Sequence, residues 1–161
     1  MEHARLPTYT SLRQLVDLVG AEGGRVFVRW SRGPRYDLAP GQVSTDELTG
    51  VAMPGLSASP LGVEEWWEDR PLELWVARRV YDYSHLREVK GPDVRPWTLT
   101  GREVGRGPDN EPLVTDARPV AWVGDRVIAE AVDEVARQRG AWGPLRRPTH
   151  LGHEGWEHPQ R

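Results

Sequence analysis

Glycine and proline interrupt this chain so often that no regular element in it can run far. They account for 17 and 14 of its 161 residues, and both residue types end or bend helices and strands. No apolar run approaches the roughly 18 residues that a membrane-spanning helix needs. The chain has no cysteine, which excludes a disulfide framework and a thiol nucleophile. We therefore expect a small globular domain built from short elements.

The net charge and the N-terminal residues indicate which partners and which compartment to expect. A formal net charge of −3 argues against a nucleic-acid partner attracted by bulk charge. The first ten residues, MEHARLPTYT, lack the apolar core of a signal peptide. We expect a cytoplasmic protein that makes no contact with a membrane. The eight tryptophans are explained by packing in a small core or by anchoring a partner.

The hydrophobic pattern predicts a helix near each end of the domain. Ser11 or Thr10 can cap a helix to about Val19, and Asp125 can cap another to about Arg139. Val127, Ile128, Ala131, Val132 and Val135 are expected to face inward in the second helix. The stretch from Leu72 to Leu86 has a helical period but a strand-like composition, and both interpretations stay open.

Short strands fill most of the remaining chain. Alternation and turn residues predict strands over 25–31, 51–61, 95–103, 111–115 and 119–123, with single helical turns over 45–49 and 63–67. Mixed short elements of this kind favour an α+β class, with mainly antiparallel strands and a few flanking helices. We assign residues 1–140 to one compact domain and 141–161 to a loosely held C-terminal tail.

Familiar catalytic motifs are absent. The sequence has no GxSxG, GxGxxG, HExxH or phosphate loop. The tail holds four residues of metal-ligating type, but nothing there fixes them, so we expect no metal; they are His150, His153, Glu154 and His158. Asp82, Ser84 and His85 are too close in sequence to converge as a hydrolytic triad.

One constellation combines groups that can bind and act on a substrate. Arg29 lies on the apolar strand VFVRWS, and Ser57 and Ser59 lie in GLSASPL. Asp109 and Glu111 stand two residues apart in PDNEPLV, so both side chains project to one face if that segment is extended. They enter a strand from a glycine-rich loop, a frequent position for a functional carboxylate.

This order of residues resembles the Arg–Ser–Glu pattern of ADP-ribosyltransferases. The segment VRWSRGPRYDLAPG is similar in layout to the first strand and loop of the small rifampin ADP-ribosyltransferases, with Arg29 where those enzymes have histidine. The chain departs from the pattern in having SAS for STS and DNE for Glu/Gln-x-Glu. The segments DELTG, PGLS, WVARR and GRGPDNEPL, within residues 10–130, also resemble a family of small actinobacterial proteins with no assigned function.

The transferase resemblance implies an ADP-ribosyltransferase-like fold, NAD as the substrate, and either ADP-ribosyl transfer or an NAD glycohydrolase-like reaction. Glu111 would stabilise the oxocarbenium-like state formed when the nicotinamide–ribose bond breaks, and Asp109 would orient or deprotonate a small-molecule or protein acceptor. The remaining site residues would bind NAD. Arg29 would do so through its planar fork, and Tyr81 or Trp75 would stack on the nicotinamide ring. The full set is Arg29, Ser57, Ser59, Tyr81 and Trp75.

Each of these residues also has a purely structural interpretation. Arg29 can pair with a buried acid, the two serines can serve a turn near Pro60, and the two carboxylates can be solvated loop charges or a helix-capping pair. The competing functions are a degenerate transferase fold that binds a nucleotide without turnover and a non-catalytic module that uses Trp66, Trp67 and Trp97 as exposed anchors.

Overall fold

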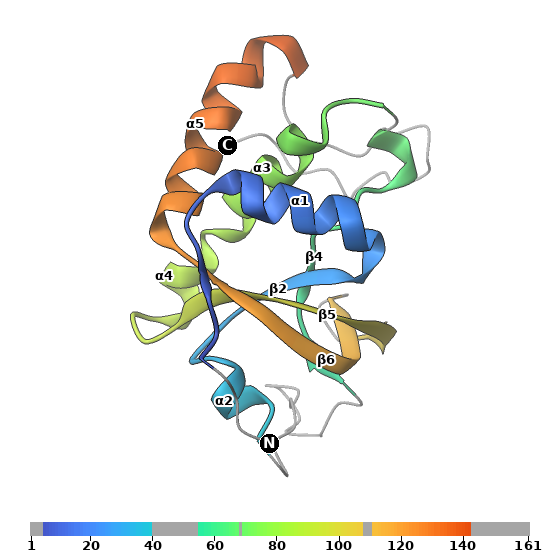
Figure 1. The fold of residues 1–161 in the computed structure, drawn as a ribbon, viewed down its shortest axis with the longest axis vertical. Helices are drawn as coiled ribbons and strands as arrows, with labels where there is room; N and C mark the ends of the chain where they lie inside the picture. The colour runs from blue at the N-terminus through green and yellow to red at the C-terminus, as the bar shows by residue number, and fades with distance from the viewer. Residues whose placement is uncertain (1–4, 40–54, 68, 108–110, 143–161) are drawn as a thin grey trace.

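The computed structural model describes residues 5–39, 55–67, 69–107 and 111–142. It shows an α+β protein in which three helices pack on one side of a curled sheet (Figure 1). These helices are α1 (Leu12–Glu22), α3 (Leu72–Tyr83) and α5 (Asp125–Trp142). Two shorter helices, α2 (Pro34–Asp37) and α4 (Leu86–Lys90), flank the sheet. Single 3₁₀ turns lie at Gly23–Arg25 and Glu65–Trp67.

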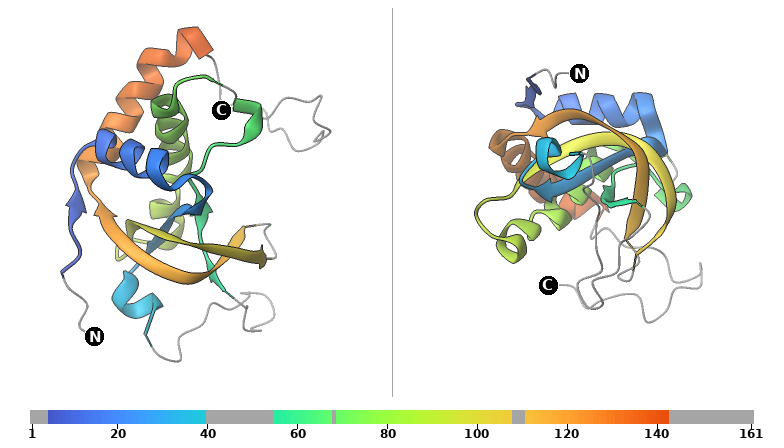
Figure 2. Two further views of the ribbon diagram at one scale, coloured as in Figure 1. Left: turned by 45° about the vertical axis from the view of Figure 1, so that its right-hand side comes forward. Right: turned by 90° about the horizontal axis from the view of Figure 1, so that it is seen from below.

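Three antiparallel strands form the body of the sheet. They are β2 (Val26–Ser31), β5 (Arg95–Arg106) and β6 (Pro112–Val123), paired in the order β6-β5-β2. The short β1 (Thr8–Tyr9) adds to β6 in parallel. Seen from below, β5 and β6 curve over β2 (Figure 2).

Residues 56–60 close the curl, and we call them the closing strand. Their first half, β3 (Leu56–Ser57), pairs with β6, and their second half, β4 (Ser59–Pro60), pairs with β2. The amide of Ala58 donates to the carbonyl of Pro112 (3.1 Å), and the amide of Leu61 donates to that of Val26 (2.9 Å). The two outer strands of the three-stranded body are thereby joined through one segment.

The alternation of side chains along β2 divides the core in two. Val26 and Val28 pack among the buried residues of α1, α3 and α5, whereas Phe27 packs with Trp97 and Leu99 inside the curl. A strand directs successive side chains to opposite faces, so Arg29 projects from the same face as Phe27.

Most predicted elements are confirmed. Ser11 caps α1 with a capping box that involves Gln14, and a left-handed Gly23 (φ 61°) ends the helix. The ambiguous stretch from Leu72 is a helix, because its apolar period buries Leu74, Trp75, Val76, Ala77 and Val80 against the core. The α+β class with mainly antiparallel strands is also confirmed. Within the described residues, no helix is both long enough and apolar enough to cross a membrane.

The remaining predictions need correction or lie outside the described residues. The two strands expected over 111–115 and 119–123 are one strand, β6, because a bulge near Asp116 (φ 56°) carries the pairing through instead of ending it. Val132, expected inside, is 41% exposed. Helix α5 runs to Trp142 rather than Arg139. The turn at 45–49 and the chain from 143 onward are outside the described residues.

Candidate functional site

Two hollows lie at opposite ends of β2. The one at the end of the strand, which we call the α2 cavity, has a volume of about 540 Å³. Its walls come from β2, α2 and the segment around the end of α4. The polar and charged residues that line it include Arg29, Ser31, Arg32, Arg35, Tyr36, Asp37 and Lys90.

The α2 cavity is rich in positive charge. Among the described residues, four cationic side chains line it against one carboxylate, that of Asp37. This excess stands out because the whole chain carries a formal net charge of −3. Arg32 and Arg35 are exposed, and Arg35 makes no hydrogen bond or ion pair within the described part of the chain. A cavity of this composition attracts anions.

Arg29 is held firmly at the inner wall of this cavity. Its Nε donates to Asp37 Oδ2 at 2.7 Å, and its Nη1 donates to the Ser57 carbonyl at 2.6 Å and to Ser57 Oγ at 3.1 Å. The Arg29 and Asp37 side chains are only 16% and 12% exposed. The guanidinium therefore links α2 and the closing strand to β2. This agrees with the structural interpretation of Arg29, in which an arginine on a core strand pairs with a shielded acid.

Ser31 completes this network from the same face of β2. Its hydroxyl donates to Asp37 Oδ2 and accepts from Trp97 Nε1 (2.9 Å) and from the amide of Gly33 (3.1 Å). Both acceptor positions and the single proton of the hydroxyl are then used. The Asp37 carboxylate is consequently fixed by two donors, and the position of α2 is fixed with it.

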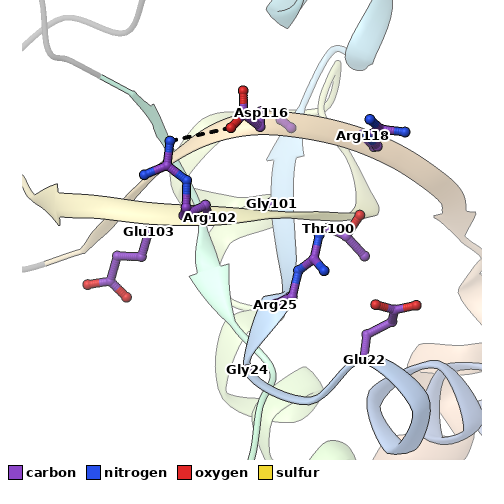
Figure 3. Close-up of a pocket in the computed structure, with 10 residues that line it drawn as sticks. Glu22, Gly24, Arg25, Thr100, Gly101, Arg102, Glu103, Asp116 and Arg118 are labelled. Atoms are coloured by element: carbon purple, nitrogen blue, oxygen red, sulfur yellow. Dashed lines mark hydrogen bonds and ion pairs between the residues drawn. The ribbon is translucent and has the colours of Figure 1, made fainter.

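The second hollow, which we call the bulge groove, lies at the start of β2 and has a volume of about 940 Å³. Its described lining carries three arginines and three acids: Arg25, Arg102, Arg118, Glu22, Glu103 and Asp116. Figure 3 shows Arg102 reaching across the β5–β6 hairpin to Asp116, at 3.4 Å. Glu103 pairs with Arg106 at 2.7 Å. These charges are balanced in number, and four of the six residues that carry them lie on the β5–β6 hairpin.

The structure brings together part of the constellation predicted from sequence. Arg29 and Ser57 are in direct contact. Ser57 also pairs with Leu113, two residues after Glu111, so the closing strand places the start of β6 beside Ser57. Ser59 lies in β4 opposite Val28. Glu111 precedes β6 and its carbonyl accepts from the amide of Gly107 at 2.8 Å, while Asp109 lies outside the described residues.

The two aromatic residues proposed to stack on nicotinamide lie apart from Arg29. Trp75 is fully buried and donates from Nε1 to the Leu61 carbonyl at 3.0 Å. It contacts Trp66 and Trp67 on the helical side of the sheet, so it has no exposed face for a ligand. Tyr81 is 46% exposed on α3. Neither residue lines the α2 cavity.

The tryptophans expected as exposed anchors need a correction. Trp67 and Trp97 are 2% and 0% exposed, because Trp67 packs in the aromatic cluster and Trp97 fills the inside of the curl. Only Trp66, of these three, is half-buried. Packing in the core is therefore the role of Trp67 and Trp97.

Most of the α2 cavity is not predicted from the sequence. Arg32, Arg35 and Asp37 all lie in the segment RGPRYDLAPG, whose prolines and glycines indicate turns and no site. The signal that could have found it is the pair of arginines that follows a core-strand arginine. Lys90 is the only lysine in the chain, and its Nζ donates to the carbonyl of Trp30 at 3.0 Å. Among the described residues, no group of histidine, aspartate or glutamate side chains could hold a metal ion.

Fold and site together define a small α+β domain whose curled sheet is closed by one strand and carries a basic cavity at one end. The chain belongs to a family of unknown function, DUF6098, whose characteristic sequence matches residues 2–143. No curated protein and no solved structure matches the chain.

Proposed function

We propose that this protein binds a phosphate-bearing small molecule in the α2 cavity and works as a binding or regulatory module. The observation that carries the proposal is the described lining of that cavity, in which four cations and one carboxylate meet in a chain of net negative charge. Several positive charges around one cavity raise the local positive potential, which attracts an anion.

The geometry suits a phosphate better than a single carboxylate. Arginine donates readily to phosphate oxygens, and the contacts to Asp37 and Ser57, which use Nε and Nη1 of Arg29, position its remaining Nη2 group in advance. Arg35 adds a charge on an exposed side chain, and Lys90 lies on the α4 side of the same cavity. A multiply charged phosphate can contact several of these groups at once, which a singly charged ligand cannot do to the same extent.

A second candidate function is the transfer of ADP-ribose from NAD. It is favoured by the contact between Arg29 and Ser57 and by the pairing of Ser57 beside the start of β6. In this proposal Glu111 stabilises the oxocarbenium-like state and Asp109 serves the acceptor. NAD also carries a pyrophosphate, so a titration with NAD bears on both candidates and nicotinamide release separates them.

The test is a calorimetric titration of the full chain with inorganic pyrophosphate and with NAD, followed by an assay for nicotinamide. We expect both ligands to bind, and we expect binding to weaken when salt rises from about 50 to about 200 mM, because exposed charges are screened. Arg35→Gln should lower the affinity at least about tenfold, which corresponds to about 1.4 kcal/mol.

The matched control is Arg118→Gln in the bulge groove, which removes an exposed arginine of the other hollow and should leave the affinity unchanged. Binding without nicotinamide release would support the module and contradict the transferase. Failure of both ligands to bind, or equal effects of the two substitutions, would contradict the proposed site.

A further inference from the structure

The α2 cavity contains an aromatic platform beside its cations. Tyr36 is 53% exposed although it lines the cavity. The Arg32 guanidinium lies over one face of its ring, 4.4 Å from the ring centroid. A flat cation on one face of an aromatic ring is a favourable pair, and an exposed aromatic surface of this kind is where nucleic-acid bases and other flat rings stack.

Contacts at both ends of α2 anchor the segment that carries this platform. At its start, Gly33 has φ +127°, and a Cβ there would lie 2.7 Å from Trp122 Cη2, so the chain enters α2 pressed against the indole of β6. At its end, the Asp37 carboxylate is fixed by Arg29 and Ser31. Tyr36 is one of the three residues between these anchors, and a preorganised platform loses little entropy when a ring stacks on it.

The ring and the cations are close enough for one ligand to contact both. Arg29, Arg35 and Tyr36 line a single hollow of about 540 Å³, which is within the range of small-molecule sites and suits a nucleotide. Inorganic phosphate alone would contact the cations and leave the exposed part of the tyrosine ring in water. A nucleoside without phosphate would leave the cationic charge unneutralised.

We infer that the phosphate-bearing ligand of the α2 cavity is a nucleotide, whose base stacks on Tyr36 while its phosphates contact Arg29 and Arg35. This inference rests on the proposed function and adds the chemical class of the ligand. Stacking contacts only the flat face of the base, so several bases are accepted. The base and the phosphates contribute to the affinity separately.

The experiment compares ADP with inorganic pyrophosphate by calorimetric titration of the full chain. We expect ADP to bind at least about tenfold more tightly than pyrophosphate, since only ADP gains the stacking contact. Tyr36→Leu should remove this advantage without changing the affinity for pyrophosphate, and Tyr36→Phe should retain it because the ring remains. Tyr81→Leu is the matched control, since Tyr81 is an exposed tyrosine outside the cavity. Thermal unfolding of each variant verifies that it is folded.

The outcomes separate the two proposals. If pyrophosphate binds as tightly as ADP, or if Tyr36→Leu leaves the preference for ADP intact, the nucleotide inference is wrong and the anion site stands. If neither ligand binds, the proposed function fails and the inference fails with it. A loss of ADP preference in both Tyr36→Leu and Tyr81→Leu would also overturn the assignment to this platform.

Discussion

The two ends of β2 carry hollows that differ in size, in charge and in the exposure of their ion pairs. The bulge groove is the larger, about 940 Å³ against about 540 Å³ for the α2 cavity. Its Arg102–Asp116 pair is 68% and 73% exposed, whereas the Arg29–Asp37 pair in the α2 cavity is 16% and 12% exposed. The groove balances its charges across a hairpin, and the cavity holds an excess of cations against a shielded network.

Exposure of the ion pairs, more than volume, decides which hollow is preorganised for a ligand. An exposed pair in water contributes little and is easily screened. A shielded arginine that is fixed by several partners keeps its geometry when a ligand arrives, so its position is preorganised. The smaller hollow is therefore the better candidate for binding.

The largest expected effect comes from removing the shielded arginine. Arg29→Ala leaves the Asp37 carboxylate and the Ser57 carbonyl without their shared donor, and we expect the free energy of unfolding to fall by about 3 kcal/mol. Arg102→Ala in the groove should lower it by less than about 1 kcal/mol. Urea unfolding measures both, and equal losses would remove the energetic contrast between the two regions.

The anchoring of α2 can be tested through Gly33. Alanine there meets a backbone at φ +127° and places its Cβ 2.7 Å from Trp122, so we expect a loss of about 2 kcal/mol. A Cβ at Gly105 would meet no described atom within 4 Å, and the φ of Gly105 is one that any residue adopts, so Gly105→Ala should cost nothing. Thermal or urea unfolding of the two variants would contradict this account if Gly33→Ala proved as stable as Gly105→Ala.

The closing strand pairs with β2, which lines the α2 cavity, and with β6, which lines the bulge groove. Tyr83 of α3 also contacts it. The Tyr83 hydroxyl donates to the Pro60 carbonyl at 2.9 Å, and burial raises the pKa of Tyr83 above its ordinary value. The unfolded chain then loses its phenol proton at a lower pH than the folded chain, so stability is complete below pH about 10 and falls as pH rises further.

Tyr83→Phe should lower the free energy of unfolding at neutral pH by about 1 kcal/mol, the value of one hydrogen bond. The substitution should also reduce the loss of folding stability at alkaline pH. Urea unfolding between pH about 8 and about 11 measures both effects, and an unchanged alkaline slope in the variant would show that other groups cause it.

The smallest effect is expected in the groove, at Asp116. Its positive φ of 56° is a conformation that glycine adopts without strain, and its pair with Arg102 is exposed. Asp116→Gly relieves the backbone while it removes a weak ion pair, so we expect a change of less than about 0.5 kcal/mol by urea unfolding. A substantially larger loss would mean that the groove network is stronger than its exposure indicates.

Several elements can be predicted from local signals, whereas the pairing of segments far apart in the sequence cannot. The cap at Ser11 and the alternation of VFVRWS are read from neighbouring residues, and both are confirmed. The closing strand depends on residues 56–60 meeting two strands far along the chain, which no local pattern contains. The uninterrupted run of β6 depends on a bulge whose αL residue is aspartate rather than glycine.

The candidate site is likewise predictable from the sequence only in part. Arg29 stands out in the sequence because a charge on an apolar strand needs a partner. Its partner Asp37 cannot be assigned from the sequence, since that contact requires α2 to fold back through Gly33 against Trp122. The transferase resemblance predicts that Trp75 meets a ligand, but the helical period of its segment turns it into the core. That Glu111 acts in catalysis stays a prediction.

The most direct test of the central claim is to map the binding of pyrophosphate by the amide NMR signals of the full chain. We predict that the perturbed amides are those of residues 29–37 and the end of α4, around the α2 cavity. The signals of the bulge groove, at residues 22–25, 100–103 and 116–118, should stay in place. Perturbation centred on the groove, or no perturbation at either end of β2, would contradict the assignment of the α2 cavity as the binding site.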